Sequence, residues 1–213
     1  NFLSKLLSVG TLGLKKDRKL VPTRWSITAT DDIIGKNLIK EIKDFNEINS
    51  YYSFFGSYLG NYYLILMFPE IWSYELFETY VPQNWNFAKP LRYGTDFERY
   101  DGRRYYAHNT AGGYYTVRLA ILEKLEEMKR QASVLALRFI TDEYTMPLGV
   151  WCTREAARKA VFNKPIEFSS KELLINYAKA LVKKKFGYNI GYILRNSILL
   201  RSIKQQKKLM QFT

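Results

Sequence analysis

Leu20-Val-Pro-Thr-Arg-Trp-Ser-Ile-Thr-Ala-Thr-Asp-Asp32 is the stretch from which the fold is predicted. Apolar residues at 25, 27 and 29 alternate with polar ones, which indicates a half-buried strand that ends near Thr28. Asp31 or Asp32 can then cap a helix that extends to about Lys43. We therefore expect a strand followed directly by a helix, with polar side chains and two carboxylates exposed at their junction.

The pattern of the following residues predicts one α+β domain. Apolar runs at 51–55 and 62–68, separated by glycine and asparagine, are typical of a hairpin, and 134–140 is predicted to be another strand. The segment 72–80 fits a strand or a helix, and 82–110 is irregular. We expect helices at about 114–131, 153–162, 170–186 and 190–204.

The expected architecture is a mostly antiparallel sheet backed by helices, with a helical C-terminal part. The domain would cover residues 1–204 and a tail would follow at 205–213. Because the first residue is Asn1 and not Met, we expect upstream residues to be missing.

The composition excludes several classes of protein. The chain has 213 residues and is 47% hydrophobic, so it can form a packed core. Its one cysteine, Cys152, excludes internal disulfides and a cysteine-rich zinc site in these residues. No apolar run approaches the roughly 20 residues that span a bilayer. The charges at 15–19 follow the apolar run instead of preceding it, unlike a signal peptide. We expect a soluble, cytoplasmic protein with no membrane partner.

The positive charge is concentrated at the C-terminal end. The net charge is +13, and the residues from Leu173 onward contain nine Lys or Arg and no Asp or Glu. Such a patch is typical of a polyanion-binding surface, although a solvated lysine-rich helix has the same composition. In 82–110, arginines interleaved with tyrosines can bind phosphates and stack on bases, or can simply hold a surface loop. The candidate nucleic-acid contacts are Lys183, Lys184, Lys185, Arg195, Arg201, Arg103 and Arg104.

Two acidic pairs are candidate metal ligands. Asp31-Asp32 and Asp142-Glu143 lie at expected strand ends, where carboxylates can hold Mg²⁺ or Mn²⁺ for phosphodiester chemistry. The alternative is helix capping for Asp31-Asp32 and solvation for Asp142-Glu143. Whether the pairs meet in space cannot be derived from one sequence, so a divalent metal remains an alternative.

Other candidate residues would bind a nucleotide or phosphate. Arg24 and Arg154 supply guanidinium donors, with Ser26 and Thr28 beside Arg24. The one histidine, His108, precedes Gly112-Gly113 where a loop meets a helix. Alternatively, Arg24, Ser26 and Thr28 form the outward face of a strand, Arg154 forms an ion pair at a helix start, and His108 is structural. The catalytic candidates are Arg24, Asp31, Asp32, His108, Glu143 and Arg154.

Three stretches resemble the archaeal Nre family of DNA repair proteins. They are the opening stretch, Gly112-Gly-Tyr-Tyr-Thr-Val-Arg-Leu-Ala120, and Glu143-Tyr-Thr-Met-Pro-Leu-Gly-Val-Trp151 continuing to Arg154-Glu155. The resemblance implies a role in DNA repair. Members of that family can carry a cysteine-rich zinc motif near the N-terminus, which this chain lacks, through loss or because the region is missing.

The last eight residues resemble the tail by which that family binds the sliding clamp (PCNA). Gln206, Leu209 and Phe212 are spaced by three, so in a 3₁₀ turn they lie along one edge. The clamp-binding pattern ends in two aromatic residues, whereas here the second is Thr213, which predicts weaker binding. Alternatively, the tail is a basic helix whose Leu209 and Phe212 side chains pack against the domain.

Three functions follow from these observations. The leading one is a DNA repair factor, with or without an activity of its own, that binds DNA through its basic surface and the clamp through its tail. The second is a metal-dependent enzyme acting on nucleic acid through the acidic pairs. The third is a nucleotide-handling enzyme built around Arg24 and His108.

Overall fold

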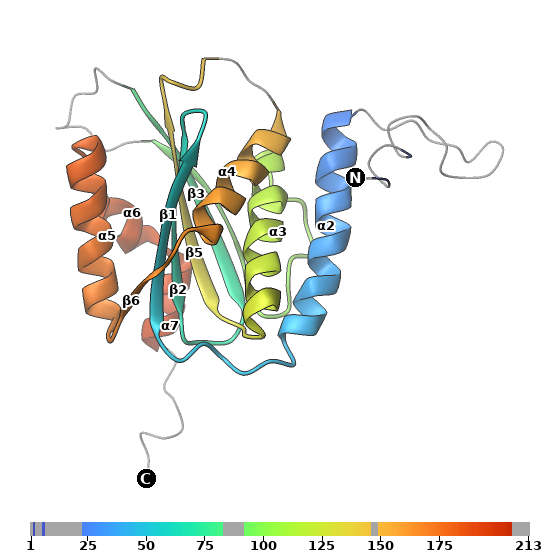
Figure 1. Ribbon diagram of the computed structural model, residues 1–213, viewed down its shortest axis with the longest axis horizontal. Helices are drawn as coiled ribbons and strands as arrows, with labels where there is room; N and C mark the ends of the chain where they lie inside the picture. The colour runs from blue at the N-terminus through green and yellow to red at the C-terminus, as the bar shows by residue number, and fades with distance from the viewer. Residues whose placement is uncertain (1, 3–5, 7–22, 83–91, 146–148, 206–213) are drawn as a thin grey trace, which may run out of the picture.

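The computed structural model describes residues 2, 6, 23–82, 92–145 and 149–205, shown as coloured ribbons in Figure 1. Six strands form one sheet in the order β4-β3-β5-β2-β1-β6. Every neighbouring pair is antiparallel except β3 and β5, which are parallel. The strands are β1 (Tyr51–Tyr58), β2 (Asn61–Phe68), β3 (Ser73–Val81), β4 (Tyr93–Glu98), β5 (Ser133–Thr141) and β6 (Ile166–Phe168).

Helices cover both faces of the sheet. Figure 1 shows α2, α3 and α4 on one side and α5, α6 and α7 on the other. Their bounds are α2 (Thr23–Ile42), α3 (Ala111–Met128), α4 (Val150–Phe162), α5 (Lys171–Phe186), α6 (Gly191–Asn196) and α7 (Ile198–Gln205). This arrangement confirms the predicted α+β class with a mostly antiparallel sheet and a helical C-terminal part. Within the described residues, no helix is both long and apolar enough to cross a membrane.

The central strand β2 explains why the sheet has a core on each face. Successive side chains of a strand point to opposite faces. Tyr63, Ile65 and Met67 pack with α2, α3 and α4. Leu64, Leu66 and Phe68 pack with α5, α6 and α7 instead. A strand that is buried on both faces is apolar at successive positions, as the sequence of β2 indicates.

The predicted strand at the start of the chain is wrong, because residues 23–42 form the single helix α2. Its buried positions include Thr28, Asp31, Gly35, Ile39 and Ile42, which recur at the spacing of a helix. Since the first of these residues are small or polar, hydrophobic periodicity could not detect the stripe. The predicted cap is also wrong, since Asp31 and Asp32 lie inside the helix.

Several other predictions are confirmed with changed boundaries. The hairpin turns at Leu59-Gly60, which have positive φ angles of 48° and 72°. Segment 73–81 is a strand, and β4 forms within the region predicted to be irregular. Helix α5 lies within the range predicted for it: its N-cap is Ser170, whose side chain accepts a hydrogen bond from the Leu173 amide, and its C-cap is Gly187.

The predicted last helix is two helices, α6 and α7, that are separated at Ser197. The buried carboxylate of Glu75 explains the break, because it accepts hydrogen bonds from the Ser197 hydroxyl and from the amides of Ile198 and Leu199. A carboxylate at a helix N-terminus satisfies free N–H groups and complements the helix dipole. Gln206, Leu209 and Phe212 lie outside the described residues, as does the side chain of Arg24.

Candidate functional site

The three motif stretches meet in the layer formed by α2, α3 and α4. Asp31 of α2 accepts a hydrogen bond of 2.7 Å from the Arg154 guanidinium of α4. The Thr116 and Thr153 hydroxyls, on α3 and α4, lie 2.7 Å apart. Residues that are far apart in the sequence are therefore joined by polar contacts inside one helical layer. Of the candidate catalytic residues, this layer brings together Asp31, Asp32 and Arg154.

Asp31 is an ionisable group in a buried environment. Its side chain is 1% exposed, and one of its two oxygens has no hydrogen-bond partner in the described structure. Burial raises the pKa of Asp31 to about 6, against the opposing effect of the Arg154 charge. The carboxyl group therefore changes charge close to neutral pH.

The raised pKa predicts a pH-dependent stability that an Asp31→Asn variant lacks. Between the ordinary pKa of 3.8 and the folded value of about 6, the folded chain binds the proton more tightly than the unfolded chain does. Protonation of Asp31 therefore stabilises the fold at low pH, and this contribution is lost as the pH rises through about 6. Relative to the variant, the free energy of unfolding of the wild type should fall by roughly 2–3 kcal/mol between pH 4 and pH 7.

Chemical denaturation of both proteins at pH 4, 5, 6 and 7 measures this difference. Asp44→Asn is a matched control, because Asp44 is exposed just beyond the end of α2. If the wild type and the Asp31→Asn variant had parallel pH profiles, the buried titration would be contradicted.

A second buried network is centred on Arg118 of α3. Its guanidinium donates to Glu98 at 2.8 Å and to Asp32 at 2.5 Å. Glu98 is 1% exposed and also accepts hydrogen bonds from the Tyr114 hydroxyl and the Trp72 indole. Burial alone would lower the pKa of Arg118, but the nearby carboxylates raise it, so the side chain stays positively charged.

A pocket of about 180 Å³ opens beside this network. Its lining residues come from α2, from α3 and from the segment that connects β4 to α3. We call it the Arg118 pocket. It is lined by Asp32, Lys36, Arg103, Arg104, Tyr105, Tyr106, Tyr115 and Arg118.

The Arg103 side chain gives this connecting segment its shape. It donates to Asp96 at 2.9 Å, to the Phe97 carbonyl at 2.8 Å and to the carbonyl oxygens of Tyr105 and Tyr106. The Arg103 guanidinium therefore uses its hydrogen bonds to hold the pocket wall in place. Arg104 is exposed and forms no hydrogen bond or ion pair within the described part of the chain.

His108 lies next to the pocket wall but not in its lining. The His108 side chain is exposed, and its ring contacts the Tyr106 ring with centroids 5.2 Å apart. It shares no hydrogen bond with Asp31 or Glu143 in the described structure.

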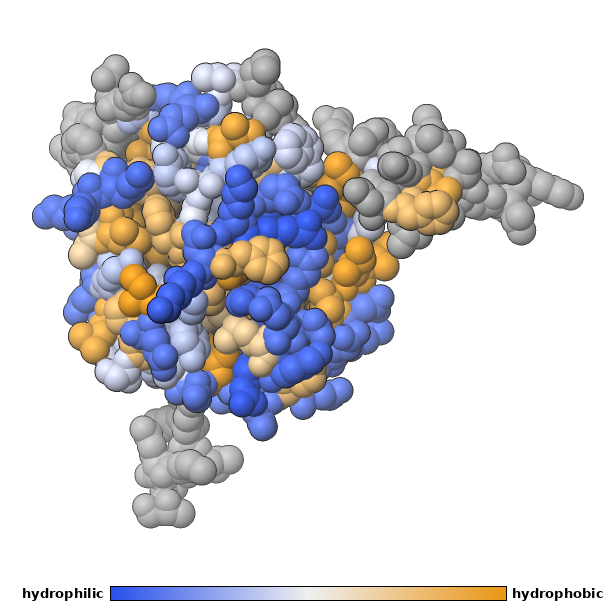
Figure 2. All heavy atoms as spheres, in the orientation of Figure 1, coloured by the Kyte–Doolittle hydropathy of each residue, from blue (hydrophilic) through white to orange (hydrophobic). Residues whose placement is uncertain are grey.

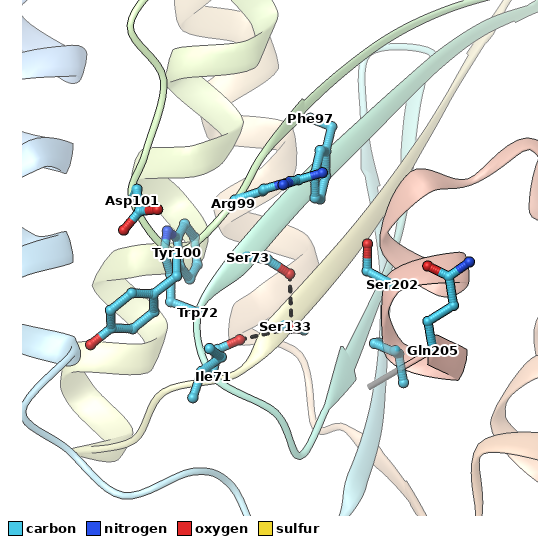
Figure 3. Close-up of a pocket in the computed structure, with 11 residues that line it drawn as sticks. Ile71, Trp72, Ser73, Phe97, Arg99, Tyr100, Asp101, Ser133, Ser202 and Gln205 are labelled. Carbon is cyan, nitrogen blue, oxygen red and sulfur yellow. Dashed lines mark hydrogen bonds between the residues drawn. The ribbon is translucent and has the colours of Figure 1, made fainter. Parts of the chain in front are cut away.

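A larger pocket of about 460 Å³ lies between the sheet and α7. Figure 3 shows Ser202 and Gln205 of α7 facing Ser73, Phe97 and Arg99 across it. Three of its polar residues, Trp72, Ser73 and Ser133, are already hydrogen-bonded. The Ser73 and Ser133 hydroxyls lie 2.8 Å apart, and the Trp72 indole donates to Glu98.

The two acidic pairs do not form one cluster. Glu143 accepts a hydrogen bond of 2.9 Å from the Tyr62 hydroxyl, and Asp142 accepts one from the Tyr80 hydroxyl. Asp31 and Asp32 pair with arginines on the helices instead. In residues 23–82, 92–145 and 149–205, no three His, Cys, Asp or Glu side chains are grouped so that they could hold a metal ion.

The C-terminal helices present the basic residues predicted to contact nucleic acid. Their exposed cations lie on the α5–α7 side of the sheet and form what we call the C-terminal basic face: Lys179, Lys183, Lys184, Lys185, Arg195, Arg201 and Lys204. None of these side chains forms an ion pair with a described carboxylate, whereas the arginines of the opposite layer mostly do. No described ion pair therefore neutralises the charge of this face.

The opposite layer has a different surface. In Figure 2 the molecule is largely hydrophilic over α3 and α4, and hydrophobic side chains reach the surface at the edge formed by α2. The exposed apolar residues of α2 include Ile33 and Ile34. The positively charged residues of α3 and α4 include Lys124, Lys129 and Arg158, which pair with nearby glutamates.

Comparison with known proteins gives a consistent result. A family described as "Archaeal Nre, N-terminal" matches residues 1–86, and one described as "Archaeal Nre, C-terminal" matches residues 98–212. The DNA repair protein NreB of Archaeoglobus fulgidus is 38% identical over 96% of this chain and 51% of its own length. The DNA repair protein NreA of the same organism is 39% identical over 86% of this chain and 47% of its own length.

A third relative comes from a different archaeon. The DNA repair protein NreA of Haloferax volcanii is 39% identical over 74% of this chain and 38% of its own length. The chain thus spans about half or less of the length of these relatives. No solved structure is significantly similar to it.

Proposed function

Because the chain belongs to the archaeal Nre family, we propose that it is a DNA repair factor that binds DNA through the C-terminal basic face. The repair role is supported by relatives that are 38–39% identical and are named DNA repair proteins. The proposed DNA contacts are supported by one structural observation: seven exposed cations lie on α5, α6 and α7 without an ion-pair partner among the described residues.

Uncompensated cations favour a polyanion for a physical reason. A lysine that is already paired with a carboxylate must break that pair before it neutralises a phosphate, whereas a free one need not. Lys183, Lys184 and Lys185 are all exposed at the end of α5, so each is accessible to a phosphate group. Contacts to phosphates carry no sequence information, so the expected binding is independent of DNA sequence.

DNA affinity is expected to fall steeply with salt. If four to six phosphates are neutralised, the slope of log affinity against log salt is about −4 to −5, because each contact releases condensed counterions. A fourfold rise in salt concentration should then weaken binding by roughly 10²–10³-fold. Fluorescence anisotropy with a labelled duplex and a labelled single strand measures the slope. An affinity that did not change with salt would contradict the proposal.

We further propose that the tail binds the sliding clamp through Gln206, Leu209 and Phe212. The support is their spacing of three residues and the clamp-binding tail that the sequence resembles. Leu209 and Phe212 would fill an apolar groove of the clamp while Gln206 forms a hydrogen bond beside it, as short motifs with a few anchors do.

Calorimetry of a peptide covering residues 202–213 against the cognate clamp tests this contact. Because Thr213 replaces the second terminal aromatic residue of the pattern, we expect micromolar affinity that the Leu209→Ala/Phe212→Ala double variant abolishes. Equal binding by the double variant, or no heat at high micromolar concentration, would contradict clamp binding.

A further inference from the structure

The Arg118 pocket contains hydrogen-bond donors that the fold does not use. A guanidinium group has five N–H donors, and in the described structure Arg118 gives one to Glu98 and one to Asp32. Its Nε atom has no hydrogen-bond partner there, and it is buried against Gly35 of α2, where an added Cβ would lie 3.4 Å away. A buried donor without an acceptor is destabilising, which favours the binding of a group that accepts its hydrogen bond.

Further donors line the same pocket. The Tyr115 hydroxyl accepts a hydrogen bond of 3.0 Å from the Ala107 amide, so its own hydrogen remains available to a ligand. Burial raises the pKa of Tyr115, which keeps that hydroxyl protonated at neutral pH. The exposed guanidinium of Arg104 lies at the rim.

The carboxylates that face the pocket are neutralised. Among the described residues of the lining, Asp32 is the only acidic one, and it is paired with Arg118 at 2.5 Å and with Lys36 at 2.7 Å. Asp96, behind the wall, is paired with Arg103 at 2.9 Å. An incoming anion would therefore meet paired carboxylates together with the free charge of Arg104.

The size of the pocket restricts the ligand. Its volume of about 180 Å³ is smaller than the roughly 300–1,000 Å³ of ordinary small-molecule sites. It can hold a compact group, and charge-assisted hydrogen bonds from arginines suit the oxygens of a phosphate. Tyrosine rings at the rim can in addition contact the sugar or base that carries the phosphate.

We infer that the Arg118 pocket is a binding site for a phosphate monoester, held by Arg118, Arg104 and the Tyr115 hydroxyl. The phosphate would come either from the terminal phosphate of a DNA strand or from a free nucleotide, because both present the same group. The site lies on the opposite side of the sheet from the C-terminal basic face, so the inference goes beyond the proposed function and can be tested separately.

Inorganic phosphate is the first probe, with the full chain as the protein. At constant ionic strength and pH 8, phosphate should raise the melting temperature relative to chloride, since a ligand that binds the folded state stabilises it. Arg104→Gln should weaken phosphate binding by about tenfold, and Tyr115→Phe should weaken it several-fold, because each removes a hydrogen bond to a charged ligand. Both substitutions avoid Arg118, whose removal would disturb the fold.

Arg130→Gln is the matched control, because Arg130 is exposed beyond the end of α3 and outside the pocket lining. This control should bind phosphate like the wild type. Equal stabilisation by phosphate and chloride would overturn the inference, and so would undiminished phosphate binding by Arg104→Gln.

Two oligonucleotides distinguish the sources of the phosphate. A 5′-phosphorylated strand that binds at least tenfold more tightly than its 5′-hydroxyl counterpart would support a strand end as the ligand. Equal binding of the two strands, with tight binding of a nucleoside monophosphate, would support a free nucleotide. The comparison is repeated in the Lys183→Glu/Lys184→Glu/Lys185→Glu variant, where phosphate binding should persist even if DNA binding through the basic face is lost or was never present.

Discussion

An Arg118→Met variant is expected to lose roughly 3–5 kcal/mol of its free energy of unfolding, the amount typical of breaking a buried ion pair from one side. The arginine is the cation that compensates Glu98, which is 1% exposed, and it also pairs with Asp32. Without it, the Glu98 carboxylate stays in a low-dielectric environment with only hydrogen bonds from Tyr114 and Trp72. Urea denaturation monitored by circular dichroism measures the loss.

Two further variants separate charge from packing. Lys129→Met, on an exposed side chain at the end of α3, should change the stability by no more than about 0.5 kcal/mol. Adding Glu98→Gln to Arg118→Met should restore at least about 1 kcal/mol, because the uncompensated charge is removed together with its partner. If the double variant were no more stable than Arg118→Met alone, the loss would come from packing and not from the buried carboxylate.

Charge reversal of Lys183, Lys184 and Lys185 is expected to have the largest effect on DNA binding. The three exposed side chains end α5, so glutamates there would replace about three phosphate contacts by repulsion. At low salt the affinity should fall by at least about 100-fold, and the salt dependence should become less steep by about three units of slope. Fluorescence anisotropy across a salt series gives both quantities.

A control variant has the same change of net charge, because three lysines of the opposite layer are replaced by glutamates. Lys40, Lys129 and Lys159 are exposed on α2, at the end of α3 and on α4, respectively. Reversing all three should change the DNA affinity by less than about fivefold, since only the long-range field is altered. A similar loss in both triple variants would mean that net charge, and not the C-terminal basic face, determines binding.

The sequence predicted the elements whose hydrophobic pattern is strong. β2 and β5 are buried on both faces, so their apolar runs identified them, and α5 lies within the predicted range 170–186. Helix α2 was missed because its buried stripe near the N-terminus is made of Thr28, Asp31 and Gly35, which hydrophobic periodicity does not register. β4 was missed because its strand pattern is short and lies within an irregular, aromatic-rich region.

The polar sites were harder to predict than the fold. Asp31 and Arg154 were both candidates, but only the packing of α2 against α3 and α4 reveals that they form a pair. Arg118 and Glu98 were not singled out. Arg118 lies one turn from each of the buried residues Tyr114 and Ile121, so an arginine within an apolar helical stripe is the signal that could have identified it.

The assignment of DNA contacts to the C-terminal basic face is tested most directly by cross-linking. The chain is irradiated with a DNA strand that carries photoreactive bromouracil, and the cross-linked peptides are identified by mass spectrometry. We expect the cross-linked residues to fall mainly within 173–205, on α5, α6 and α7. Cross-links confined to α2, α3 and α4 would contradict it.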